Sequence, residues 1–235
     1  MRTTSKLIWI GAILIGYAIF PAQAGLYSLD NGSISTVLNA SDGTETLDNW
    51  FGNVFTAQPG ANLITRVDLG IFTTTPNSSA SVALYSVTDP GGNPALGATR
   101  IYTQAFTPLT GDGTNAFLQS ISLTSPVNIS TGDRFLVSIL IRNVIGDPPN
   151  DVYPFLLDTS GSAAGSFWDR SAPNTFNLDN LSSAKLVSQP LSPGGFIPGN
   201  DHVIIRAFGA PVPEPSVLAL GSLMAMALAL RRRAR

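Results

Sequence analysis

Six segments of the chain alternate apolar and polar residues with a period of two, and this alternation constrains the fold more than any other feature. The segments are residues 63–72, 80–87, 100–106, 116–124, 133–142 and 202–208. Such alternation is the signature of a β-strand that has one buried face. In segment 63–72 the residues that share one face are Leu63, Thr65, Val67, Leu69 and Ile71.

Segment 133–142 alternates in the same way, and its second face also carries some apolar residues. Its inward residues are predicted to be Phe135, Val137, Ile139 and Ile141. Its opposite face carries Arg134, Ser138 and Arg142, and two leucines on that face, Leu136 and Leu140, are expected to be partly covered.

Turn-forming stretches separate these segments. TDPGGNPALG, STGD and IGDPPND carry the Gly, Pro, Asn and Asp residues that set turn dihedrals. No amphipathic helix is expected away from the two ends of the chain. Many short strands joined by such turns predict an all-β fold, an antiparallel β-sandwich or jelly roll. An N-terminal signal-peptide helix and a C-terminal hydrophobic helix are expected to flank it.

The N-terminal end has the three parts of a secretory signal peptide. Arg2 and Lys6 precede an apolar run over residues 7–20, and Ala22-Gln23-Ala24 follows as an A-x-A site. Cleavage is predicted between Ala24 and Gly25, after export by the Sec machinery. The alternative interpretation is an uncleaved membrane helix. The predicted organisation is a signal peptide over 1–24, one β-domain over 25–210 and a separate C-terminal segment over 211–235.

Charge is distributed unevenly along the chain. Six of the thirteen basic residues lie in the terminal segments, namely Arg2, Lys6, Arg231, Arg232, Arg233 and Arg235. Seven basic residues then remain against fifteen acidic ones, so the exported part carries a net charge of about −8. Nucleic-acid binding needs Lys and Arg to neutralise phosphates, and this balance argues against a nucleic-acid partner.

The chain contains no cysteine. A secreted domain of this kind cannot be held by disulfides, so its stability must come from a buried core. Thiolate zinc sites and cysteine nucleophiles are excluded by the same count.

Residue types that would support catalysis are sparse. His202 is the one histidine, it is expected to be half-exposed at the start of a predicted strand, and no G-x-S-x-G elbow accompanies it. The two glutamates are Glu45 and Glu214, and most aspartates lie in turns. Paired carboxylates for glycoside hydrolysis are therefore not evident. The sequence favours a protein that is not an enzyme and needs no cofactor.

Two binding hypotheses stay open. Calcium takes carboxylate and loop carbonyl oxygens, and Asp147 with Asp151 in GDPPND is the leading candidate pair, although it matches no full calcium-loop pattern. Sugars stack on exposed aromatic rings. Trp168 in GSFWDRS is the first candidate for such a platform and Trp50 in LDNWFGNVF the second. Buried aromatic residues of a sandwich core are the more common alternative.

The C-terminal end combines a proline-flanked glutamate, a short apolar run and an arginine cluster. The residues are Val212-Pro213-Glu214-Pro215, then 216–230, then Arg231-Arg232-Arg233. As a helix, the apolar run would reach only ~22 Å, whereas the bilayer core is ~30 Å thick. The arginines would stay on the cytoplasmic side by the positive-inside rule. This pattern suits a temporary stop in the membrane better than a permanent anchor.

This tail closely resembles the PEP-CTERM sorting signal of exported proteins in Gram-negative bacteria that make exopolysaccharide. The resemblance implies processing by exosortase, a membrane protease that would read Pro213, Glu214 and Pro215. It also implies transient inner-membrane association and a final place on the cell surface or in the extracellular matrix. Exopolysaccharide is then a candidate partner. A plain C-terminal anchor is the alternative.

The region before the tail resembles, more loosely, the choice-of-anchor β-domains. The supporting stretches are NVFTAQPGANLITRVDLGIF, with a strand expected to begin near Phe55, then SVALYSVTDPGGNPALG and GSFWDRS. The resemblance implies a surface or matrix protein. The leading prediction is thus an exported, non-enzymatic β-sandwich protein sorted at its C-terminus, and the alternative is a carbohydrate-binding module.

Overall fold

The computed structural model describes residues 25–30, 36–38, 46–71, 79–109, 117–145, 155–158, 164–187 and 202–212. Every helix or strand assigned in this part of the chain is a β-strand, which confirms the predicted all-β class. The predicted flanking helices lie outside the described residues. Among the residues that are described, no helix is long and apolar enough to span a membrane.

Thirteen strands form within the described residues, and all of their pairings are antiparallel. They are β1 (Gly25–Tyr27), β2 (Thr36–Leu38), β3 (Thr46–Thr56), β4 (Leu63–Ile71), β5 (Ala80–Val87), β6 (Ala98–Phe106), β7 (Phe117–Asn128), β8 (Arg134–Ile145), β9 (Phe155–Asp158), β10 (Ser166–Ser171), β11 (Lys185–Leu186), β12 (His202–Val203) and β13 (Ile205–Ala210).

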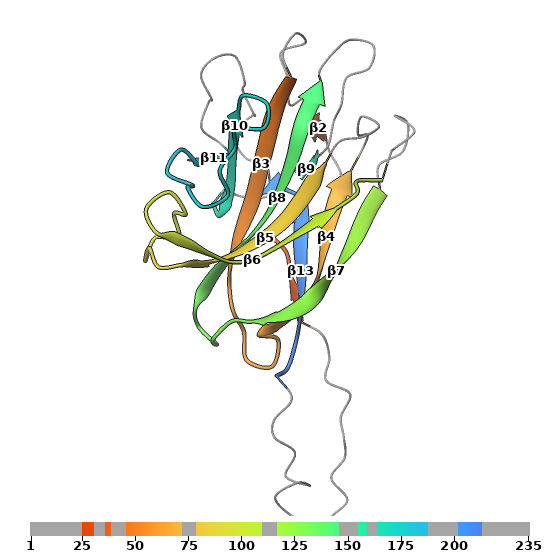
Figure 1. The fold of residues 1–235 in the computed structure, drawn as a ribbon. Helices are drawn as coiled ribbons and strands as arrows, with labels where there is room; N and C mark the ends of the chain where they lie inside the picture. The colour runs from red at the N-terminus through yellow and green to blue at the C-terminus, as the bar shows by residue number, and fades with distance from the viewer. Residues whose placement is uncertain are drawn as a thin grey trace, which may run out of the picture.

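The strands form two layers (Figure 1). One layer is a six-stranded sheet with the order β11-β10-β3-β8-β5-β6, and the other is a four-stranded sheet with the order β1-β13-β4-β7. A three-stranded sheet, β12-β9-β2, continues the second layer. The link is Ile204 between β12 and β13, whose carbonyl accepts a hydrogen bond from the Gly70 N–H of β4 (2.9 Å). The two antiparallel sheets are sandwich-like, but their strand orders do not establish a jelly roll.

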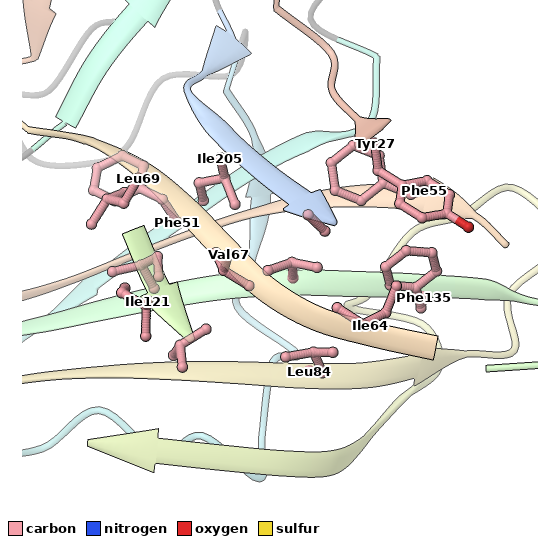
Figure 2. Close-up of a cluster of buried hydrophobic side chains, with 14 of the residues drawn as sticks. Tyr27, Phe51, Phe55, Ile64, Val67, Leu69, Leu84, Ile121, Phe135 and Ile205 are labelled. Carbon is pink, nitrogen blue, oxygen red and sulfur yellow. The ribbon is translucent and has the colours of Figure 1, made fainter. Parts of the chain in front are cut away.

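The main hydrophobic core lies between the two layers (Figure 2). The six-stranded sheet contributes residues that include Phe51, Leu84 and the predicted inward set of β8, Phe135, Val137, Ile139 and Ile141. The facing sheet contributes residues that include Tyr27, Ile64, Val67, Leu69, Ile121 and Ile205. Alternation therefore predicts this face of β8 correctly. Burial of these aliphatic and aromatic side chains is the principal source of stability in a domain without disulfides.

Strand β4 departs from the simple alternation predicted for segment 63–72. Its pairing with β7 shifts register between Ile64 and Arg66. Ile64 is fully buried as a result, whereas Leu63 and Thr65 are only half-buried. An extra residue in one strand of a pair exchanges the two faces of the strand. The predicted inward positions of Leu63 and Thr65 are therefore wrong, whereas those of Val67 and Leu69 are correct.

Strand β3 lies at the centre of the six-stranded sheet and is absent from the sequence prediction. Its sequence, TLDNWFGNVFT, is interrupted by Asp, Asn and Gly, which are rare in strands. Asp48 and Asn53 are nevertheless buried, and each has a long-range partner. The Asn53 side chain, for example, donates from Nδ2 to the carbonyl of Val203 (2.8 Å). Phe55, where a strand was expected to begin, is the second-last residue of β3.

A second hydrophobic core covers the outer face of the six-stranded sheet. The segment between β10 and β11, residues 172–184, folds over this face, and we call it the strap. It buries four apolar side chains of its own, Phe176, Leu178, Leu181 and Ala184, together with Trp50, Tyr85 and others of the sheet. Leu136 and Leu140 are fully buried beneath it. The prediction that these leucines are partly covered is wrong because a loop of irregular sequence closes over them.

The first and last strands of the domain lie side by side. Gly25 of β1 pairs with Gly209 of β13, and Tyr27 pairs with Ala207. The contact is tight because a Cβ placed on Gly25 would lie 2.3 Å from the Cβ of Ala61, and one on Gly209 would lie 1.6 Å from the Ala61 carbonyl oxygen. The chain therefore enters and leaves the domain at the same end, the lower end in Figure 1.

Candidate functional site

Two adjacent hollows lie where β3 ends, β8 begins and β5 continues into the loop 88–97. The first has a volume of about 430 Å³, and its polar lining residues are Thr56, Ser86, Thr88, Asp89, Asp133 and Arg134. The second has a volume of about 320 Å³ and an apolar wall that includes Val54, Phe55, Phe167 and Leu186. Thr56 and Arg134 line both hollows. We call the two together the Arg134 groove.

Arg134 is held in place by the backbone of the neighbouring loop. Its Nη1 donates to the carbonyl of Asp89 (3.2 Å) and also to the carbonyl of Pro90. As the first residue of β8, it pairs with Thr56 of β3 on one side and with Val87 of β5 on the other. Arg134 therefore links the ends of β3, β5 and β8 to the loop 88–97.

The loop 88–97 forms a rim of the Arg134 groove and is braced by its own hydrogen bonds. The Asn93 N–H donates to the Asp89 carboxylate (2.8 Å), and the Gly92 N–H donates to the Asp89 carbonyl (2.9 Å). The Thr88 N–H donates to the Gly97 carbonyl and closes the base of the loop (2.8 Å). These bonds fix the loop in one shape, so the groove is formed before any ligand arrives.

The strap is joined to the six-stranded sheet by an ion pair between the partly exposed Arg142 and the buried Asp48. Arg142 Nη1 lies 2.6 Å from the Asp48 carboxylate, and Asp48 is completely buried. The same carboxylate accepts a hydrogen bond from the Phe176 N–H (3.2 Å), while Arg142 Nη2 donates to the Phe176 carbonyl (3.1 Å). Both backbone groups of Phe176 are thus held by one charged pair.

Two further buried groups contact the strap. The Tyr85 hydroxyl donates to the Leu178 carbonyl (2.9 Å), and burial raises the pKa of Tyr85 to about 12. Ser183 Oγ donates to the Asp169 carboxylate. Burial raises the pKa of Asp169 above its ordinary value of 3.8, and the hydrogen bonds from Ser183 and from the Arg170 N–H only partly offset this rise.

Both tryptophans predicted as sugar platforms are buried. Trp50 is 0% exposed and stacks on Phe176 under the strap. Trp168 is 3% exposed and lies against Phe51, with ring centroids 6.3 Å apart. Neither ring presents a face on which a sugar could stack. The prediction of sugar contact through Trp168 or Trp50 is therefore corrected by their packing between covered sheet faces.

His202 is also buried, with 3% of its surface exposed. It begins β12 and pairs with Asp158 of β9 in the small sheet. Such a position differs from the half-exposed strand end that the sequence suggests, because β9 and β12 continue the second layer. The neighbouring residues therefore cover the imidazole of His202.

Several other predicted site residues lie outside the described residues. They are the signal-cleavage residues Ala22 and Ala24, the sorting residues Pro213, Glu214, Pro215, Arg231, Arg232 and Arg233, and the calcium candidates Asp147 and Asp151. Gly25, on the other side of the predicted cleavage point, begins β1. Within the described part of the chain, no three His, Asp or Glu residues gather as a metal site.

The sequence does not reveal the Arg134 groove. The stretches 88–97 and 130–133 both appear in it as ordinary turns. Their meeting depends on β8 pairing with β3 on one side and β5 on the other. The one signal available was an Asp residue in each turn. Comparisons with known proteins add no assignment, because no protein-family model and no curated protein sequence matches the chain.

Proposed function

We propose that the chain is an exported, non-enzymatic β-domain protein of the cell surface or exopolysaccharide matrix. Its C-terminal segment would be recognised and processed by an exosortase-type membrane protease in a Gram-negative bacterium. The proposal rests on the signal-peptide pattern before Gly25 and on the tripartite pattern from Val212 to Arg233. The alternative, a plain C-terminal anchor, differs in retaining the tail.

The pairing of β1 with β13 is the observation that carries this proposal. β1 begins at Gly25, the residue that would follow signal-peptide cleavage, and β13 ends at Ala210, shortly before Pro213. Removal of either flanking segment would leave both strands whole. Both segments would also leave the domain at one end, so a single membrane surface could hold both during export.

The non-enzymatic part of the proposal draws on the burial of His202. The sequence contains one histidine, and it is covered within the small sheet. A hydrolase based on that residue would first need to uncover it. A carbohydrate-binding role through Trp50 or Trp168 also loses its support, because both side chains are buried. A binding role at the Arg134 groove is a separate proposal and is argued in the next subsection.

Substitution of Glu214 tests the sorting step. The wild-type chain, Glu214→Ala and Glu45→Ala would be expressed in a Gram-negative host that carries an exosortase. Mass spectrometry of peptides from the envelope and the medium would then look for the arginine tail. We expect Glu214→Ala to retain the tail and the other two proteins to lack it. Equal processing of Glu214→Ala and wild type would show that Pro213-Glu214-Pro215 is not the recognised handle.

A further inference from the structure

We propose that the Arg134 groove binds a neutral, polyhydroxylated ligand, namely a short glycan segment. This inference goes beyond export and sorting, which require no ligand. It also does not depend on the tryptophans, which are buried. The argument uses the two unlike halves of the groove, one polar and one apolar, and the arginine that lies between them.

The polar half offers acceptors and hydroxyls at close range. Asp133 is exposed at the turn before β8, and its backbone is already engaged: its N–H donates to Ser130 O (3.0 Å) and its carbonyl accepts from Ala57 N–H (2.9 Å). These bonds fix the backbone of Asp133, which is one of the residues that line the hollow. A carboxylate accepts hydrogen bonds from hydroxyl groups, and Thr56, which lines the same hollow, carries a hydroxyl that both donates and accepts.

Arg134 supplies directed donors to both halves. Its Nη1 is occupied by the carbonyls of Asp89 and Pro90. The guanidinium has five N–H donors in a rigid plane, so its orientation is set while Nε and Nη2 keep donors of their own. A side chain that is held in advance loses little conformational entropy when a ligand binds.

The apolar half suits the C–H face of a sugar ring. Its wall includes the half-buried Val54 and Leu186, and glycines on its rim keep it open. Gly92 has a φ of 78°, where only glycine is comfortable, and a Cβ there would lie 3.6 Å from Val54 Cγ1 and 3.7 Å from Arg134 Cδ. A side chain at this position would therefore occupy the space between the apolar wall and the arginine.

The charge and the volume of the Arg134 groove restrict the chemical class of its ligand. Two acidic residues, Asp89 and Asp133, and one basic residue, Arg134, line the polar half, and this balance disfavours phosphates and uronic acids. The polar lining disfavours a purely apolar ligand, because its polar groups would be desolvated without partners. Volumes of about 430 and 320 Å³ fall within the range typical of small-molecule sites. A neutral ligand with many hydroxyls and some C–H surface satisfies both halves.

The test is a saturation-transfer difference NMR titration of the full chain. The protein would be held in a detergent without a sugar headgroup, so that the detergent does not compete. The probes are four neutral disaccharides, maltose, cellobiose, lactose and sucrose, with glucuronate as the anionic comparison. This readout does not involve processing of the tail, so its failure and the failure of the proposed function are distinguishable.

Three variants locate the binding. Asp133→Ala removes the exposed carboxylate and should weaken binding about tenfold, the factor that corresponds to ~1.4 kcal/mol. Thr56→Val keeps the shape of a strand residue, removes one hydroxyl and should weaken binding less. Asp179→Ala is the matched control, because Asp179 is an exposed carboxylate on the strap, paired with Arg100. It should leave binding unchanged.

The expected result is saturable binding of at least one neutral disaccharide, with the stated order of the variants. The proposal is overturned if no neutral disaccharide gives saturable binding or if glucuronate alone binds. It is also overturned if Asp133→Ala and Thr56→Val both bind as tightly as wild type, since the sugar would then occupy another surface.

Discussion

The ring of Trp50 stacks on the ring of Phe176, with centroids 5.9 Å apart and planes 12° from parallel. Trp50 belongs to the central strand β3, and Phe176 belongs to the strap. The contact makes an irregular segment part of the hydrophobic core. The strap should therefore contribute to global stability, and its loss should uncover the outer face of the six-stranded sheet.

Truncation of Phe176 tests this role of the strap. Phe176→Ala should lower the free energy of unfolding by about 3 kcal/mol, the usual cost of removing a buried phenylalanine ring. It should also increase quenching of tryptophan fluorescence by acrylamide, because Trp50 loses its cover. Leu96→Ala is the control, since Leu96 is 74% exposed, and it should change stability by less than ~0.5 kcal/mol. Equal stability of the two variants would mean that the strap packs only loosely.

The Asp48–Arg142 pair should behave as a unit. Arg142→Met leaves the Asp48 carboxylate buried without its partner and should lower the free energy of unfolding by about 3 kcal/mol. The double variant Asp48→Asn/Arg142→Met removes that lone charge and keeps an amide oxygen for the Phe176 N–H. It should therefore be more stable than Arg142→Met alone. Chemical denaturation measures both, and a double variant that is less stable than Arg142→Met would contradict the coupling of the two side chains.

Ionisation of Tyr85 should destabilise the folded state at alkaline pH. Burial raises its pKa from 10.0 to about 12, so the folded state keeps the proton that the unfolded state releases. Its contribution to stability is complete below pH 10 and is lost as the pH rises from 10 to 12. Tyr85→Phe should cost about 1 kcal/mol at neutral pH through the lost bond to Leu178.

Tyr85→Phe should lose stability less steeply than wild type as the pH rises through the alkaline range. Unfolding free energies measured at neutral pH and across the alkaline range decide the matter. Parallel curves for the two proteins would show that Tyr85 ionises equally easily in the folded and unfolded states.

Gly209 should tolerate no side chain. A Cβ at this position would lie 1.6 Å from the Ala61 carbonyl oxygen, a backbone atom that can move only with the whole β3–β4 connection. Gly209→Ala should therefore separate β1 from β13 and lower the melting temperature. Gly60→Ala is the comparison, because Gly60 has a φ of 74° and open space around it, so only backbone strain of about 1 kcal/mol is expected there. A smaller effect at 209 than at 60 would contradict the tight contact.

The local sequence pattern predicts the regular strands of this fold. It fails where partners distant in sequence determine whether a residue can be buried. The inward set of β8 follows from period-two alternation, because large apolar residues occupy every second position from Phe135 to Ile141. Strand β3 does not follow, since Asp48 and Asn53 break the pattern. Asp48 pairs with Arg142, and the Asn53 amide donates to the Val203 carbonyl, and both of these partners are distant in sequence.

The candidate site also depends on long-range contacts that the local sequence does not reveal. Trp50 and Trp168 lie in stretches rich in polar residues, so their surroundings suggest exposure, and only the strap and the facing sheet bury them. The Arg134 groove needs two turns and the end of β3 to meet. No spacing in the sequence specifies that meeting, because it is set by the order of strands in the sheet.

Export with processing at both ends is the central claim, and the intact mass of the wild-type protein recovered from its native cells tests it most directly. The account predicts a chain that begins at Gly25 and lacks the arginines from Arg231 onward. A recovered chain that begins at Met1, or one that still carries Arg235, would contradict it.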